Sequence, residues 1–362
     1  MFGLNLQKAY EEILYKKGEE LIKSGQDDKV KKLLEKIPSI LNGSTDDTAN
    51  STYQSLLNTI HDMNSYEEDL NEYNQSSIKS YWYEALILLQ AVIKISEESS
   101  IEMLEELNEK EIDDKDDLLY SVLFKIHSRS ISMAKEILIL LRNGFSDGSL
   151  ARWRSLHEST VIFTLLTNNF QDKDFTYNLI ERYIDFSEIE DAKEVKILNR
   201  LGFSNLNQDY IQKVDKRRRE LIGKYGKEFY YDNFWAAPLF GNRKDRIHFH
   251  ELENLAELQN LNQYYMRANQ QLHLSPKGMV ESLTMSSDID QTSYFLYGSS
   301  SFGLSVPLQL TTISLMQITT QFLLLDGTVE KIIIAKILIK LSNKCKTVSN
   351  DIYEELEKGT IE

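Results

Sequence analysis

Residues 143–167 read NGFSDGSLARWRSLHESTVIFTLLT, and this stretch decides which fold the chain can adopt. Apolar residues recur at helical spacing on both sides of it, which predicts one long helix that ends here and another that begins here. Asn143-Gly144 is a helix-stop signal, and Ser146 or Asp147 can cap the second helix. The stretch therefore predicts two long helices joined by a short turn.

The same helical spacing recurs along the rest of the chain, and no β pattern of convincing length interrupts it. Only 4 of the 362 residues are proline, and none lies between Pro38 and Pro238. Because proline costs about 3 kcal/mol inside a helix, its absence leaves room for long helices. We predict an all-α fold, a multi-helix bundle with long antiparallel helices and no significant sheet. A helix stop at Asn42-Gly43 and an aromatic packed loop over 227–245 are expected to interrupt it.

Negative charge is concentrated in the first third of the chain. Residues 1–120 contain 12 lysines, no arginine and 26 acidic residues, a net charge of −14 compared with −15 for the whole chain. Such a segment repels a nucleic-acid backbone and can instead bind a protein partner. We therefore divide the chain into an acidic N-terminal helical region, 1–115, and a main helical domain, 116–362.

Cysteine content and hydropathy indicate the compartment. Cys345 is the only cysteine, so no intramolecular disulfide can form, as is usual in a reducing compartment. The first residues lack the pattern of a signal peptide. The uncharged stretch Ser299–Leu325 is interrupted by Gln, Thr and Pro307, so we expect a buried helix there and no membrane span. These features predict a cytoplasmic protein without membrane contact.

Three polar side chains in the opening stretch share one helix face. Arg154, His157 and Glu158 stand at i, i+3 and i+4, and apolar residues follow at 161–166. The cluster is therefore expected to face inward or to line a cleft. One interpretation is a structural polar network in which Arg154 and Glu158 form an ion pair. The other is a site in which that pair holds His157 beside a fixed cation, for acid–base chemistry or phosphate contact.

The motif around these residues resembles a known family. Its pattern over Gly144–Glu158 is G-x-x-x-G-x-x-A-R-W-R-S-L-H-E, similar to the bacterial family called domain of unknown function 5677. The resemblance extends over about 120–285, through Glu-Arg-Tyr-Ile-Asp at 181–185, a loop with Trp235, and a tyrosine-rich helix that leads to His273 and Ser275-Pro-Lys-Gly278. It implies a helical fold and assigns no chemistry.

The same helix is also similar to the HEPN superfamily of helical ribonucleases, which occur in toxin and phage-defence systems. Their motif is an arginine, four to six residues and then a histidine, and Arg152 and His157 match its shortest form. The resemblance implies that His157 helps to activate the ribose 2′-OH while Arg152 holds the scissile phosphate. Trp153 departs from the usual polar residue after the arginine. Residues i and i+5 also lie about 140° apart on a regular helix. An irregular helix start or a dimer mate would therefore have to complete the site, and we expect a homo-oligomer.

Candidate residues outside this helix extend both interpretations. Asn269 and His273 share a helix face at i, i+4, and His273 can contact Glu158 if the two helices pack together. Between 213 and 246, ten basic and five acidic side chains leave a net charge of +5, with aromatic residues interleaved. The candidates for RNA binding are Arg217, Arg218, Arg219, Tyr231, Trp235 and, from the other helix, Asn269. The alternative for this basic island is a solvated helix face followed by packed aromatic side chains.

No cofactor and no metal are expected, because His248 and His250 point about 200° apart on a helix and cannot share one ion. The lead hypothesis is a HEPN-like protein of a bacterial defence or toxin system that cleaves RNA without a metal. Its catalytic candidates are Arg152, Arg154, His157, Glu158 and His273. The alternative is a non-enzymatic helical sensor or scaffold that binds a protein partner through the acidic N-terminal region.

Overall fold

The computed structural model describes residues 6–202, 207–273, 275–280 and 298–358. Every regular element in these ranges is a helix, so the predicted all-α class is confirmed. The α-helices are α1 (Leu6–Lys23), α2 (Asp27–Asn108), α3 (Asp114–Arg142), α4 (Ser146–Thr167), α5 (Lys173–Arg200), α6 (Gln208–Tyr225), α7 (Phe249–Leu255), α8 (Asn262–Leu272), α9 (Pro276–Val280), α10 (Ser305–Leu324) and α11 (Val329–Glu357). Three short 3₁₀ helices accompany them, η1 (Lys227–Tyr230), η2 (Phe234–Phe240) and η3 (Gln259–Leu261).

The chain divides into two compact units, Met1–Leu70 and Asn71–Glu362. The N-terminal unit contains α1 and the first part of α2, and many of its apolar side chains, such as Ile13 and Leu34, remain exposed. Helices gain most of their stability by burying an apolar face, so this unit has little tertiary support of its own. The boundary expected at residue 115 is a different division and stays a prediction.

Two Asn-Gly pairs differ in what they do to a helix. The helix stop expected at Asn42-Gly43 was wrong, because α2 runs through it, and no atom lies within 4 Å of a side chain built at Gly43. At the other pair, α3 ends and Gly144 adopts a φ of 75°. A Cβ on Gly144 would lie 2.7 Å from the backbone N of Ser300, which donates a hydrogen bond to the Gly144 carbonyl at 3.0 Å. An Asn-Gly pair therefore ends this helix where a packing partner holds the left-handed turn.

The start of α4 also differs from expectation. The N-cap position is Phe145, and no side chain caps the helix there. Ser146 and Asp147 already belong to the first turn, so the predicted cap was wrong. The physical reason is the tight turn at Gly144, which leaves only one residue between the left-handed glycine and the first helical residue.

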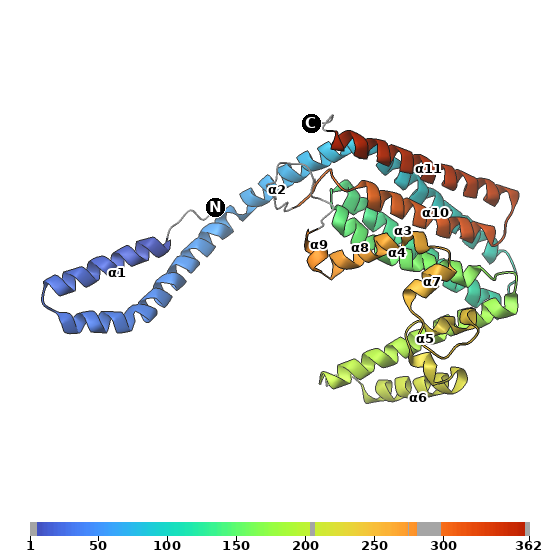
Figure 1. Ribbon diagram of the computed structural model, residues 1–362, viewed down its shortest axis with the longest axis horizontal. Coiled ribbons are helices and arrows are strands. Elements are labelled where there is room, and N and C mark those ends of the chain that lie inside the picture. Colours follow the sequence, from blue (N-terminus) through green and yellow to red (C-terminus); the bar gives the residue numbers. More distant parts are fainter. Residues whose placement is uncertain (1–5, 203–206, 274, 281–297, 359–362) are drawn as a thin grey trace. The chain divides into compact units, whose positions relative to one another are not determined.

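Helix α10 forms the centre of the second unit. It packs against α3, α4 and α11, and Figure 1 shows these helices stacked as a bundle. Leu308, Leu315, Ile318 and Phe322 of α10 are fully buried, which confirms the buried helix predicted within Ser299–Leu325. Over the part of the chain that the structure describes, no helix combines the length and the apolar content that a membrane span needs.

The aromatic segment after α6 packs onto α5. Phe229, Phe234 and Trp235 are buried, as expected for a packed aromatic loop. The guanidinium of Arg182 on α5 donates to the carbonyl of Trp235 at 3.0 Å and to that of Phe234 at 3.1 Å. A buried cation thus satisfies carbonyls that the irregular turns leave free.

Candidate functional site

The first part of the site is a ring of three polar side chains between α4 and α8. Arg154 and Glu158 form the expected ion pair, with 2.8 Å between the guanidinium and the carboxylate. Tyr265 of α8 closes the ring, because its hydroxyl accepts from Arg154 at 3.2 Å and donates to Glu158 at 2.7 Å. The Arg154 guanidinium also lies over the Tyr265 ring, 5.2 Å from its centroid. Of the face predicted from spacing, Arg154 and Glu158 therefore contact α8.

Tyr265 stays protonated in this ring. Burial and the hydrogen bond to the Glu158 carboxylate raise the pKa of Tyr265 to about 12. A hydroxyl with so high a pKa acts here as a donor that joins the two helices. The Arg154–Glu158 pair is only partly exposed, since Tyr265 covers one side of it.

The second part of the site is a buried pair between α4 and α7. Nε2 of His157 lies 2.7 Å from Oε1 of Glu253, and the two side chains are 0% and 1% exposed. The other carboxylate oxygen of Glu253 accepts from the amide of Asn262 at 2.6 Å. His157 stacks on Trp153, with 5.0 Å between ring centroids. Nδ1 of His157 has no hydrogen-bond partner among the described residues.

Arg152 and His157 do not come together. Arg152 forms an ion pair with Glu136 of α3, whereas His157 points to Glu253 of α7. The divergence follows from the i,i+5 spacing on a regular helix. An arginine–histidine pair on one surface would need a change in the helix or a contribution from a second copy.

Asn269 lies on α8 and His273 lies at its end, and neither residue joins the cluster. His273 is the C-cap residue of α8 and is exposed. Within the described ranges, neither residue forms a hydrogen bond or ion pair with Arg154 or Glu158. The helices α4 and α8 do pack together, and Tyr265 makes the contact that had been considered for His273.

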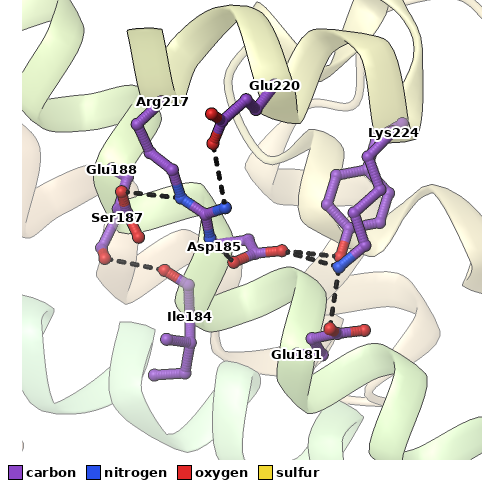
Figure 2. Close-up of polar contacts among 9 residues, drawn as sticks. Glu181, Ile184, Asp185, Ser187, Glu188, Arg217, Glu220 and Lys224 are labelled. Carbon is purple, nitrogen blue, oxygen red and sulfur yellow. Dashed lines mark hydrogen bonds and ion pairs between the residues drawn. The ribbon is translucent and has the colours of Figure 1, made fainter. Parts of the chain in front are cut away.

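The basic island consists largely of paired side chains on α6. Figure 2 shows Asp185 of α5 between Arg217 and Lys224, at 2.8 Å and 3.1 Å from their cationic groups. Glu188 binds Arg217 as well, at 3.0 Å, and raises the pKa of its guanidinium. Further ion pairs of α6 join Lys224 to Glu181, Arg217 to Glu220, and Arg218 and Arg219 to Asp215.

The aromatic candidates of the island differ in exposure. Trp235 is buried, so a nucleobase cannot stack on it in this conformation. Tyr231 is exposed, and the guanidinium of Arg246 lies 5.6 Å from its ring centroid. Of the stacking residues proposed for RNA, Tyr231 alone has a ring that solvent reaches.

Metal-binding side chains do not cluster in the described ranges, where no three His, Cys, Asp or Glu residues gather around one point. The expectation that His248 and His250 point apart on a helix was wrong, because His248 is the extended N-cap residue of α7 and its ring stacks on that of His250 at 5.7 Å between centroids.

Comparison with known proteins places the cluster in a family. Residues 120–291 match the model described as "Family of unknown function (DUF5677)". This segment belongs to the DUF5677 family. The resemblance predicted from Gly144–Glu158 is thereby confirmed. No curated protein and no solved structure matches the chain.

The DUF5677 segment contains every side chain of the site, from Arg154 on α4 to Glu253 on α7 and Tyr265 on α8. Sequence reasoning had missed Glu253, Asn262 and Tyr265. One signal was available for Glu253: it follows Leu252 directly and lies three residues before Ala256. An acidic residue among such apolar neighbours predicts a buried partner.

Proposed function

We propose that the chain is a non-enzymatic helical scaffold or sensor that binds a protein partner, and that the α4 cluster serves the fold. The observation that carries the proposal is the burial of His157, whose ring is 0% exposed and bound to Glu253. A general acid or base must reach the proton that it transfers, directly or through one water. His157 meets that requirement only if the side chains packed on its ring, which include Phe249 of α7 and Tyr265 of α8, move away from it.

The pairing of the cations supports the same proposal. Arg152, Arg154 and Arg217 each bind at least one carboxylate. A paired guanidinium must release its carboxylate before it can bind a phosphate, which lowers the affinity for RNA. Contacts of this kind join neighbouring helices, as Arg152 joins α4 to α3 and Arg217 joins α6 to α5.

The N-terminal unit supports a partner-binding role. Residues 37–70 contain six Asp and Glu residues and no Lys or Arg. Several apolar side chains of the same segment are exposed, among them Tyr53, Leu56 and Ile60. Exposed apolar surface on a helix with charged residues nearby is typical of an interaction surface. The acidic charge disfavours nucleic acid and favours a protein.

A second candidate is the HEPN-like ribonuclease of a defence or toxin system. The contact between a carboxylate and His157 favours it, because a carboxylate that orients a histidine is a feature of general-base catalysis. In that candidate, Glu253 would stay on Nε2, and Nδ1 would accept the proton of the ribose hydroxyl once α8, whose Tyr265 ring lies 5.7 Å from that of His157, had moved aside. Arg152, which is partly exposed, would hold the phosphate.

One assay separates the two candidates. The purified full chain is incubated with single-stranded RNA, as wild type, His157→Ala and Arg152→Ala. We expect the RNA to stay intact at the same level in all three. Cleavage by the wild type that disappears in both variants would overturn the proposal. Arg152→Ala keeps the comparison valid if His157→Ala folds poorly, because Arg152 lies at the surface.

A further inference from the structure

The N-terminal unit carries an apolar seam on α2, which we define as Tyr53, Leu56, Ile60, Met63 and Leu70. Four of these side chains are strongly exposed, Tyr53 at 55%, Leu56 at 39%, Ile60 at 48% and Leu70 at 42%. Within the described residues of this unit, no other segment covers them. A helix with so much exposed apolar surface gains stability when another helix packs against it.

The spacing of the seam is that of a coiled coil. Its residues follow each other at alternating steps of 3 and 4, as the a and d positions of a heptad do, with Glu67 at the one remaining a position. The seam covers two and a half heptads, which is short for a coiled coil. We therefore expect a weak and concentration-dependent association.

The side chains that flank the seam indicate which kind of partner can bind it. The e and g positions that flank it hold only uncharged side chains, Thr52, Leu57, Thr59, Asn64 and Tyr66. In coiled coils these positions choose the partner through charge, so an uncharged set does not oppose pairing with an identical helix. A basic or acidic partner helix would find no opposite charge at these positions.

The positions of the acidic residues along the helix indicate how the two paired helices are oriented. Residues 48–61 contain no Asp, Glu, Lys or Arg, whereas Asp62, Glu67, Glu68 and Asp69 follow directly. In a parallel pair the acidic halves would lie side by side and repel each other. In an antiparallel pair each acidic half lies against the uncharged half of the other helix.

We propose that residues 53–70 form an antiparallel two-stranded coiled coil with the same residues of a second copy of this chain. The inference rests on the proposed function, because it names the protein partner as a second copy. It predicts a dimer in which Ile60 packs near Met63 of the second copy and Leu56 packs near Glu67 of the second copy.

The first test is the mass of the full chain in solution, measured by sedimentation at increasing protein concentration. We expect a monomer–dimer equilibrium. Ile60→Asp should raise the dissociation constant by about tenfold or more, because it places a charge in the apolar seam. Asn58→Asp is the matched control, since it adds the same charge on the outer face of the same helix, and it should leave the constant unchanged. Glu67→Leu should lower the constant, because it completes the seam.

The second test is orientation. Two proteins that differ from the wild type by Tyr53→Cys and by Leu70→Cys are oxidised separately and as a mixture. An antiparallel pair cross-links mainly in the mixture, and a parallel pair cross-links in each protein alone.

Three outcomes would overturn the inference: a monomer at every concentration, a dimer that Ile60→Asp leaves intact, or cross-links that form in each protein alone. A monomer that also leaves RNA intact would remove the second copy as the partner. It would leave the proposed non-enzymatic function standing, with a different protein on the seam.

Discussion

The His157–Glu253 pair and the ion-pair cluster around Asp185 both lie in the DUF5677 segment, but their side chains differ in solvent exposure. His157 and Glu253 are 0% and 1% exposed, and each binds the other from a different helix. Asp185 is 9% exposed, but its partners Arg217 and Lys224 are 39% and 44% exposed. When a buried pair loses one member, the other is left without a partner and without water. Members of the Asp185 cluster can bind water instead, so the two regions should respond very differently to the same substitution.

The largest effect is expected for Glu253→Ala. It leaves Nε2 of the buried His157 and the amide of the partly buried Asn262 without their acceptor, so the free energy of unfolding should fall by about 3 to 5 kcal/mol. Glu253→Gln keeps an acceptor of the same shape and should lose less, about 1 to 2 kcal/mol. Urea unfolding followed by circular dichroism measures both. Equal losses for the two variants would show that the pair is not held by the carboxylate.

An intermediate effect is expected for Asp185→Ala. Its carboxylate accepts from Arg217, Lys224 and the hydroxyl of Tyr225, at 2.8, 3.1 and 2.8 Å. The loss should be about 2 to 3 kcal/mol, since the carboxylate is buried while both cations can turn to water. The same unfolding experiment measures it. A loss as large as that of Glu253→Ala would erase the distinction between the two regions.

Lowering the pH should reduce the stability of the native state through a second buried histidine, His127. Burial lowers the pKa of His127 from 6.5 to about 3, so the native state keeps this ring neutral. Below pH 6.5 the unfolded chain binds a proton that the native state does not bind. The stability contributed by His127 is therefore complete above pH 6.5 and is lost as the pH falls towards 3.

At pH 5 the expected loss from this residue is about 2 kcal/mol relative to pH 7. His127→Gln should be less stable at pH 7, because it disturbs the contact with Thr319, but should lose less on acidification. Unfolding curves of both proteins at pH 7 and pH 5 give the two differences. The account of His127 fails if the variant and the wild type lose equal stability between these pH values.

The smallest effect is expected for Glu188→Ala. Glu188 is 42% exposed and shares Arg217 with Asp185, so its removal should cost less than about 1 kcal/mol. Added salt should reduce even this difference, because surface charges are screened. A cost above 2 kcal/mol that salt does not change would place this ion pair with the buried ones.

Local spacing was enough to predict the helices and the shared face of Arg154 and Glu158. Both depend on contacts within one helix, and the spacing of residues in the sequence determines these contacts. The helix stop at Asn42-Gly43 could not be judged in this way. Gly144 ends a helix in contact with Ser300, whereas Gly43 has open space around it, and that difference depends on distant parts of the chain.

The partners of the α4 cluster could not be predicted from the sequence for the same reason. His157 lies beside Glu158 in sequence, yet it turns to Glu253, which lies 96 residues away. Tyr265 lies 107 residues from Glu158. Helical periodicity tells which side chains share a face, and only the packing of α7 and α8 on α4 decides what each side chain meets.

The measurement that tests the central claim most directly is a double-mutant cycle on the buried pair, from the unfolding free energies of wild type, His157→Ala, Glu253→Ala and the double variant. A pair that holds α4 to α7 predicts single losses of several kcal/mol and a coupling free energy of about 1 to 3 kcal/mol. Additive losses that are each below about 1 kcal/mol would contradict it, because His157 would then be free of the fold and available for chemistry.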